Sequence, residues 1–156
     1  MIDVAIPGYG HLVLAELVCD FNGTLARDGR LVAGASALLR DVAGVLNVRV
    51  VTGDTFGSAR AELRRYPCQV TVLDAERQAE AKAALVAQLG ADRVVAIGNG
   101  RNDRLMLAGA ALGIAVIGDE GTAVEACNAA HIVTRHIEDA LRLLLDPRRL
   151  IATLRD

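Results

Sequence analysis

Short apolar runs rich in β-branched residues alternate with helical segments along this chain, and this alternation constrains its fold more than any other feature. After a predicted N-terminal strand that ends at Cys19, such runs recur at 48–51, 70–73, 94–97, 113–117 and 132–133. Helical spacing is expected at 34–46, 56–65, 75–89, 101–111, 121–129, 137–145 and 147–154. Strands that alternate with helices form a parallel sheet covered on both faces. The pattern therefore predicts an α/β fold with a doubly wound parallel sheet in three α/β/α layers.

The N-terminal segment differs from the rest, because its pattern predicts an antiparallel β-hairpin. Residues 2–6 alternate, the sequence Pro7-Gly8-Tyr9-Gly10 predicts a turn, and residues 12–19 continue as a strand. Farther along, Asp28-Gly29 predicts a small turn inside a flap at about 25–33. The sequence has no internal repeat and no linker, so residues 1–156 are expected to form a single domain.

The composition excludes several classes of partner. The net charge is -2 and no run of Lys or Arg stands out, so the chain lacks the basic patch of a nucleic-acid-binding protein. No apolar run reaches the roughly 18 residues of a membrane span, and the N-terminus does not resemble a signal peptide. Three scattered cysteines without a Cys-x-x-Cys pair predict buried thiols rather than zinc or disulfides. We therefore expect a cytoplasmic protein that binds neither nucleic acid nor membrane.

Polar residues follow directly after several of the predicted strands, at 20–24, 52–54 and 98–103. In open parallel sheets, ligands bind beyond the carboxyl ends of the strands, where the strand order reverses. Asp20 follows a buried strand, and Gly23-Thr24 could turn backbone amides inward to hold an anion. Aspartate can accept a phosphoryl group covalently. The alternative is a helix-capping aspartate beside a plain Asn22-Gly23 turn.

Each of the other two clusters also allows a functional and a structural interpretation. Thr52 and Gly53 could hold phosphoryl oxygens, or Thr52 or Asp54 could cap the next helix. Asn99 and Asp103 lie four residues apart and offer oxygen donors for a hard cation such as Mg²⁺, or they could form a turn with a helix cap.

Lys82 is the single lysine of a chain that has sixteen arginines. A lysine within a helix is usually solvated. However, a site that neutralises a phosphate oxygen and a carboxylate at one point needs a compact ammonium rather than a planar guanidinium. The exclusive use of lysine at this position therefore favours a functional role.

Together these segments resemble the haloacid dehalogenase (HAD) superfamily of aspartyl-phosphate enzymes, whose fold is Rossmann-like. The four motifs, in the family's order, are Asp20-Phe21-Asn22-Gly23-Thr24-Leu25, Thr52-Gly53-Asp54, Lys82 and the segment 98–103. Within the superfamily the motifs look most like those of the P-type ATPase phosphorylation domain, and the chain resembles the small soluble P-type ATPase-like phosphatases. The spacing leaves no room for a cap domain, so either the substrate is large or another subunit supplies a lid.

The resemblance implies a Mg²⁺-dependent phosphatase and a role for each motif. The implied catalytic residues are Asp20 as nucleophile, with Asn22, Thr52 and Lys82. The implied phosphate-binding residues are Phe21, Asn22, Gly23, Thr52, Gly53 and Lys82. The implied metal ligands are Asp20, the backbone carbonyl of Asn22, Asn99 and Asp103. The substrate would be a phosphorylated small molecule or a phosphoprotein, and the apolar composition with the missing cap favours a homo-oligomer.

Two asparagines depart from the family pattern. Asn22 occupies the place where phosphatases of the superfamily usually have an aspartate that acts as general acid and base. Asn99 replaces a usual metal-binding aspartate, so Mg²⁺ should bind more weakly. We therefore expect a slow phosphatase. The first alternative is a regulatory module that binds phosphate or a phosphoprotein without turnover. A second, a receiver-like domain that stores a phosphoryl group on Asp20, lacks the acidic pair near its N-terminus.

Overall fold

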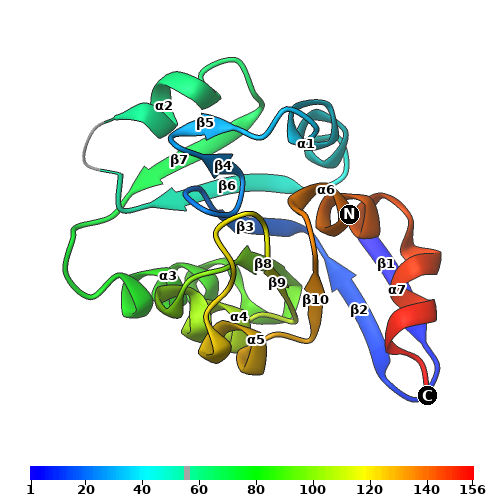
Figure 1. Ribbon diagram of the computed structural model, residues 1–156. Helices are drawn as coiled ribbons and strands as arrows, with labels where there is room; N and C mark the ends of the chain where they lie inside the picture. Colours follow the sequence, from blue (N-terminus) through cyan, green and yellow to red (C-terminus); the bar gives the residue numbers. More distant parts are fainter. Residues whose placement is uncertain (55–56) are drawn as a thin grey trace.

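The computed structural model describes residues 1–54 and 57–156, and its centre is a parallel sheet of six strands (Figure 1). The strand order is β10-β9-β8-β3-β6-β7, and every neighbouring pair is parallel. The bounds are β3 (Glu16–Asp20), β6 (Asn47–Thr52), β7 (Cys68–Val72), β8 (Val94–Gly98), β9 (Leu112–Val116) and β10 (Ile132–Thr134). Successive strands are added outward in one direction from β3 and in the other from β8. The order therefore reverses between β3 and β8, which is where such sheets bind ligands.

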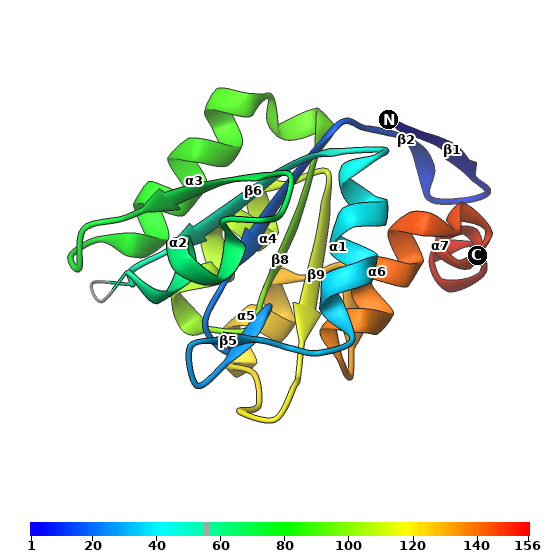
Figure 2. The ribbon, with the colours of Figure 1, turned by 90° about the horizontal axis from the view of Figure 1, so that it is seen from above.

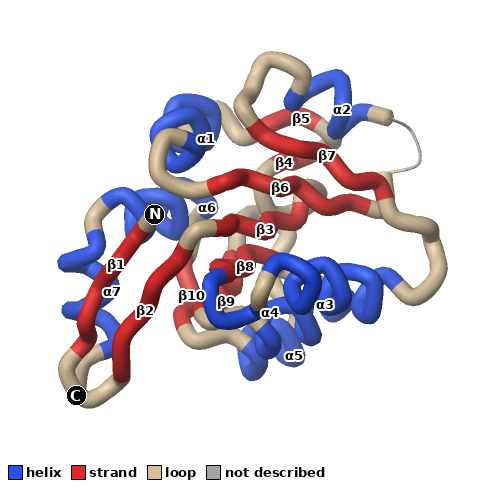
Figure 3. The backbone as a smooth tube through the Cα atoms, turned by 180° about the vertical axis from the view of Figure 1, so that it is seen from behind, coloured by secondary structure: helices blue, strands red, loops and turns tan. Residues whose placement is uncertain are grey.

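Helices cover both faces of this sheet, as the sequence predicts (Figures 2 and 3). One face carries α1 (Ala35–Ala43), α2 (Ser58–Leu63) and α6 (Ile137–Leu145), with α7 (Pro147–Leu154) following α6. The other carries α3 (Gln78–Leu89), α4 (Arg104–Gly109) and α5 (Val124–Ala129). Two 3-10 turns, η1 (Ala91–Arg93) and η2 (Arg101–Asp103), precede β8 and α4. Within the described residues, no helix combines the length and apolar character needed to cross a bilayer.

Strand β3 shows how the two faces are separated. Leu17 and Cys19 are buried in the core that includes α1 and α6, whereas Val18 is buried in the core that includes α3 and α4. Successive side chains of a strand point to opposite faces. The side chain of Asp20 therefore emerges on the side of α3, where Lys82 lies.

The N-terminal hairpin is present, but its second strand is shorter than predicted. Strands β1 (Ile2–Ile6) and β2 (Gly10–Leu14) pair antiparallel in a sheet of their own, and α7 packs against β1. The predicted strand over 12–19 is wrong as a single element, because it divides at Ala15 between two sheets. The amide of Ala15 donates to the carbonyl of Arg93 and its carbonyl accepts from Asn47, which directs the chain into the central sheet.

The other differences concern helix starts. Helix α3 begins at Gln78 rather than 75, because Arg77 has a left-handed conformation (φ 56°) that a right-handed helix does not include. Helix α5 begins at Val124 rather than 121, where the glycine also has a positive φ. The start predicted for the second helix, Phe56, lies outside the described residues, and α2 is described from Ser58.

A small flap follows β3. Strands β4 (Ala26–Arg27) and β5 (Arg30–Leu31) pair antiparallel across a turn at Asp28-Gly29. The flap and α1 fill the chain between β3 and β6, and in the described residues between β6 and α3 only α2 and β7 occur. This part of the chain carries no cap domain over the end of the sheet, in agreement with the prediction from motif spacing.

Candidate functional site

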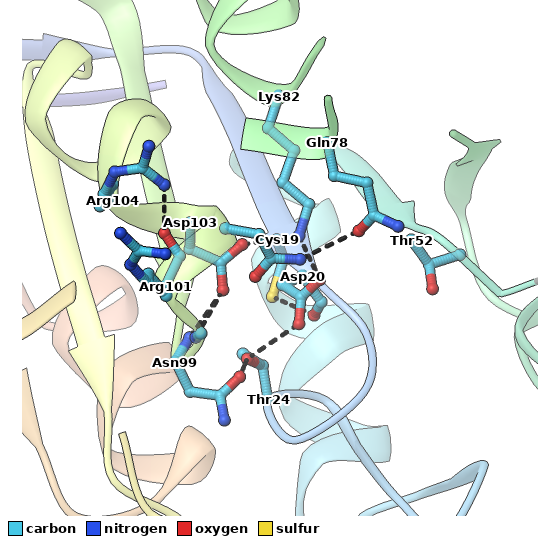
Figure 4. Close-up of polar contacts among 12 residues, drawn as sticks. Cys19, Asp20, Thr24, Thr52, Gln78, Lys82, Asn99, Arg101, Asp103 and Arg104 are labelled. Atoms are coloured by element: carbon cyan, nitrogen blue, oxygen red, sulfur yellow. Dashed lines mark hydrogen bonds and ion pairs between the residues drawn. The ribbon is translucent and has the colours of Figure 1, made fainter. Parts of the chain in front are cut away.

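The buried part of the site is an ion-pair triad made of Asp20, Lys82 and Asp103 (Figure 4). Nζ of Lys82 lies 2.7 Å from Oδ1 of Asp20 and 2.6 Å from Oδ1 of Asp103. Lys82 and Asp103 are completely shielded from solvent, and Asp20 is 7% exposed. The structure thus brings together one residue from each of three predicted motifs and gives the single lysine two carboxylate partners.

Helix α3 places this lysine on the side that faces the sheet. Ala79, Lys82 and Val86 are its buried residues, and their spacing of three and four puts them on one face. The long apolar stem of Lys82 crosses the core, while its ammonium reaches the end of β3. A compact charge can contact two carboxylates that converge on one point, which explains why arginine is not used here.

The triad shifts the pKa values of two of its members, Asp20 and Lys82. Burial, and secondarily the charge of Asp103, raises the pKa of Asp20 to about 7, although Lys82 acts in the opposite direction. Burial alone would lower the pKa of Lys82, but the charges of Asp20 and Asp103 outweigh it and raise that pKa. Two carboxylates beside one ammonium leave a net negative charge, so the triad can stabilise a further cation at Asp20.

Asp103 uses both of its carboxylate oxygens inside the protein. Oδ1 pairs with Lys82, and Oδ2 accepts the backbone amides of Asn99 (2.9 Å) and Gly100 (2.8 Å). The carboxylate therefore closes the turn between β8 and α4, as its alternative interpretation predicted, and it also holds Lys82. Asp103 is fully buried, and its carboxylate does not line the cavity described below.

The oxygen atoms that face the crevice converge on Thr24, which is buried in the loop after β3. Its hydroxyl lies 3.4 Å from Oδ2 of Asp20 and 3.1 Å from Oδ1 of Asn99. One hydroxyl carries one proton, so it can satisfy only one of these two acceptors at a time. An excess of oxygen acceptors around one point is the environment that a hard cation prefers, and these residues fit Mg²⁺. Across the described residues no group of three or more His, Cys, Asp and Glu side chains has the geometry of a metal centre.

The loop after β3 depends on Gly23. This residue has φ +76°, and a β-carbon on it would lie 2.6 Å from Nδ2 of Asn99 and 2.7 Å from Oε2 of Glu120. Its amide donates to the carbonyl of Ala26, so Gly23 shapes the loop and does not offer the free donor to a phosphate that the motif implied. Phe21 is fully buried in the core and anchors the loop, so only its backbone could contact a ligand.

Two roles are predicted for this motif, phosphoryl binding and helix capping, and Thr52 and Asp54 differ in which of them they can fill. Oδ2 of Asp54 accepts the amide of Ala59 (2.8 Å) and the hydroxyl of Ser58 (3.0 Å), so this residue caps α2. Oγ1 of Thr52 accepts the amide of Asp54 at 3.1 Å, and a hydroxyl that accepts one hydrogen bond can still donate its own proton. Thr52 and Gly53 both line the cavity described next.

A cavity of about 360 Å³ lies over the triad, at the carboxyl ends of β3, β6 and β8. The predicted residues that line it are Asp20, Asn22, Thr52, Gly53 and Asn99. Lys82 and Asp103 lie below it, out of contact with solvent. The predicted site is thus one continuous structure with a charged floor and a polar rim.

Sequence reasoning missed four residues that also line this cavity, namely Gln78, Gly100, Asn102 and Glu120. Gln78 could have been found, because it lies four residues before Lys82 and hence on the same helix face. Asn102 lies inside the predicted 98–103 motif, where only Asn99 and Asp103 were considered. Glu120 follows β9, a strand end that was not inspected.

The receiver-like alternative has no support in the position of the N-terminal acids. Asp3 lies in the hairpin and pairs with His11 at 2.6 Å. Glu16 lies at the start of β3, at the opposite end of the sheet from Asp20, and pairs with Arg49 at 3.2 Å. Neither carboxylate can reach the cavity over the triad.

Comparison with solved structures identifies the fold. A 3-deoxy-D-manno-octulosonate 8-phosphate phosphatase from Moraxella catarrhalis, in complex with magnesium, phosphate and the sugar, superposes with a TM-score of 0.72 at 12% identity, over 89% of this chain and 90% of that one. The cobalt-bound phosphatase of the same name from Haemophilus influenzae gives 0.67 at 17% identity, over 90% and 89%. A putative HAD family hydrolase from Streptomyces avermitilis gives 0.67 at 21% identity, over 84% and 82%. The chain therefore has the fold of HAD superfamily hydrolases.

Sequence comparison gives one curated relative. The uncharacterized protein MJ0073 of Methanocaldococcus jannaschii is 53% identical over 64 residues, which are 41% of this chain and 69% of that protein. The two chains belong to the same family, and the name of the relative carries no activity. No protein-family model matches the chain.

Proposed function

We propose that this chain, whose fold is that of HAD superfamily hydrolases, is a slow Mg²⁺-dependent phosphatase that forms an aspartyl-phosphate on Asp20. One observation carries the proposal. Asp20 is held through Oδ1 by a fully buried lysine, while the residue also lines the cavity over the triad. A carboxylate fixed on one side and open to a ligand on the other is arranged as a nucleophile.

The metal would be held by Asp20, Asn99 and the backbone carbonyl of Asn22, all from segments that line the cavity. Asp103 would act on it indirectly, by holding Lys82 and the turn that carries Asn99. A bound Mg²⁺ neutralises charge on the transferring phosphoryl group. Lys82 orients Asp20 and favours its ionised form, and Thr52 can donate to a phosphoryl oxygen.

The proposed reaction has two steps. An oxygen of Asp20 attacks phosphorus as the bond to the leaving oxygen breaks, and the leaving group takes a proton from water because Asn22 has none to give. Water then attacks the aspartyl-phosphate, which releases inorganic phosphate and restores the carboxylate. General acid and base catalysis contributes roughly 10²–10⁴-fold, so its loss predicts slow turnover and a preference for good leaving groups.

The substrate class follows from the open site. We expect a phosphorylated small molecule or a phosphoprotein, since the described residues place only a small flap beside the cavity. The structural neighbours that act on an octulosonate phosphate share 12% and 17% identity with this chain and so do not define its substrate. A lid from a second copy of the chain would explain how a small substrate is enclosed.

A second function is favoured by the same two asparagines. If Asn22 and Asn99 stop turnover altogether, the chain would be a phosphate- or phosphoprotein-binding regulatory module. Its triad would then serve recognition alone.

The test is hydrolysis of p-nitrophenyl phosphate and acetyl phosphate, with and without Mg²⁺, by the wild type and by Asp20→Asn. Activity that needs both the metal and Asp20 supports the phosphatase. Equal activity in Asp20→Asn would show that the acceptor is wrong. A folded wild type that binds phosphate but hydrolyses neither compound would favour the regulatory module.

A further inference from the structure

We infer that Gln78 is a phosphoryl-binding residue of this site and that Asn102 is the positioning residue that orients its amide. The inference rests on the proposed function, and it identifies a hydrogen-bond donor that none of the four motifs contains. It depends on the start of α3 at Gln78, on the hydrogen bond between Asn102 and Gln78, and on the close approach of Gln78 to Gly53.

The start of α3 directs Gln78 toward the cavity. Arg77 has a left-handed conformation (φ 56°, ψ 36°), which turns the chain sharply just before the helix. Gln78 then lies one turn before Lys82, so both side chains extend from the same face of α3. Lys82 reaches the buried carboxylates, whereas Gln78 is half-buried at the rim of the cavity (Figure 4).

Asn102 fixes which end of the glutamine amide faces the cavity. Its Nδ2 donates to Oε1 of Gln78 at 3.0 Å. Because the carbonyl oxygen is engaged there, the amide nitrogen points the other way, toward Thr52 and Gly53. Figure 4 shows this nitrogen directed at Thr52 across the cavity.

Gly53 permits this approach. A β-carbon at Gly53 would lie 2.8 Å from Cδ of Gln78 and closer still to its Nε2. Any larger residue at 53 would displace the amide group from this position. The absence of a side chain at Gly53 therefore has a reason beyond backbone flexibility, because it makes room for the amide of Gln78.

The hydrogen bonds made by the other groups of the site explain why the amide NH₂ of Gln78 would be needed as a donor to phosphate. The Gly23 amide is used inside its own loop, and Lys82 contacts Asp20 and Asp103. A bound phosphate therefore needs donors from elsewhere in the cavity. An NH₂ group donates and does not accept, so it matches phosphoryl oxygen, and its neutral charge does not compete with Lys82 for the carboxylates.

The test is the affinity for inorganic phosphate, measured by isothermal titration calorimetry with saturating Mg²⁺. Removal of a hydrogen bond to a charged ligand should weaken binding about tenfold or more in Gln78→Ala. Gln78→Glu should weaken it further, because a carboxylate would face the phosphate. The matched control is Gln88→Ala, which removes an exposed glutamine from the same helix and should bind phosphate as the wild type does.

Asn102 is tested by a double-mutant cycle in the same assay. Asn102→Ala should weaken phosphate binding when Gln78 is present and should have no further effect in Gln78→Ala. A merely structural role for Asn102 would give the same loss in both backgrounds, and thermal melting of each variant would show it as a lower midpoint.

The outcomes separate the two proposals. If the wild type binds phosphate and Gln78→Ala binds it equally well, the role of Gln78 is wrong while the proposed function stands. Additive effects in the cycle would overturn the positioning role of Asn102. If the wild type itself binds no phosphate in the presence of Mg²⁺, both the phosphate site and the role of Gln78 are overturned.

Discussion

The floor and the rim of this site differ in the chemistry of their side chains. The floor, made of Asp20, Lys82 and Asp103, contains three ionisable groups that are almost completely removed from water. The rim carries neutral amides at Asn22, Gln78, Asn99 and Asn102, together with the carboxylate of Glu120. Two of these amides stand where the family pattern has carboxylates.

This difference separates two tasks that phosphatases usually combine. The charged floor would orient the acceptor beside a bound phosphoryl group. The amide-rich rim could hold that group, but Asn22 supplies no proton for its departure and Asn99 offers a metal no charge. Under the proposed function, the site is suited to accepting phosphate and poorly suited to releasing it, and each prediction below alters one side of this contrast.

The largest effect is expected when the missing acid is restored at the rim. Asn22→Asp should increase hydrolysis of p-nitrophenyl phosphate by up to about 10²-fold, and of alkyl phosphates by more, toward the 10²–10⁴-fold range of general acid catalysis. The increase is larger for alkyl phosphates because their alkoxide is a poor leaving group and gains most from protonation. Steady-state rates for both substrates, with saturating Mg²⁺, measure it.

Asn22→Ala is the control for this change, since it removes the same amide without adding an acid and should stay slow. An Asn22→Asp variant that turns over no faster on either substrate would mean that proton supply does not limit this enzyme.

The next effect concerns the floor. Lys82→Met should lower the free energy of unfolding by about 3–5 kcal/mol, because two buried carboxylates lose their shared counter-charge. The loss should be larger above pH 7 than below it, since Asp20 has a pKa of about 7 and is neutral at lower pH. Chemical denaturation at two pH values gives both numbers.

A second substitution tests whether charge is the cause. Asp103→Asn added to Lys82→Met removes one of the unpaired charges and should recover part of the stability. If the double variant is no more stable than Lys82→Met, the loss comes from packing rather than from electrostatics.

The floor could be predicted from the sequence much better than the rim could. Asp20 and Asp103 lie in polar segments that follow apolar strands, and the rule that ligands bind where strand order reverses places these segments together without knowledge of any side chain. Lys82 was identified because it is the only lysine. Both signals can be read from the sequence, because the first depends on neighbouring residues and the second on composition.

The rim and the internal hydrogen bonds could not be obtained in this way. The partners of Asp103, the engaged amide of Gly23 and the orientation of Gln78 depend on side chains from different elements that meet only in the folded chain. The division of the first long strand at Ala15 has the same origin. Its apolar pattern is interrupted only by Glu16, and the pairing of Ala15 with Arg93 and Asn47 shows where one sheet ends.

A smaller effect is expected at the metal side of the rim. Asn99→Asp should lower the Mg²⁺ concentration needed for half-maximal thermal stabilisation by about tenfold, because it adds a charged ligand. Without metal the variant should be less stable than the wild type by about 1 kcal/mol. The amide of Asn99 donates to the carbonyl of Gly121 at 3.1 Å, and a carboxylate cannot.

Tighter Mg²⁺ binding should stabilise the variant, whereas the lost hydrogen bond to Gly121 should destabilise it. The experiment therefore tests whether residue 99 is a metal ligand. Thermal melting over a series of Mg²⁺ concentrations should therefore show the curves of variant and wild type crossing. A variant that is less stable at every Mg²⁺ concentration would mean that residue 99 does not bind the metal.

The last prediction joins floor and rim through the protonation of Asp20. Its pKa of about 7 in the folded protein exceeds the unfolded value of about 3.9. Between these two values the folded state binds the proton and the unfolded state does not. The contribution of Asp20 to stability in the metal-free protein therefore falls as pH rises through this window and is constant above it.

A metal that binds the ionised carboxylate competes with this proton, so the affinity for Mg²⁺ should change in the opposite direction. It should weaken about tenfold for each pH unit below 7 and level off above 7, where Asp20 is already ionised. Calorimetric titration of Mg²⁺ across this range measures the slope, and Asp20→Asn should remove it. An affinity that does not change with pH in the wild type would show that the metal binds at the rim without Asp20, and the floor and the rim would then be independent sites.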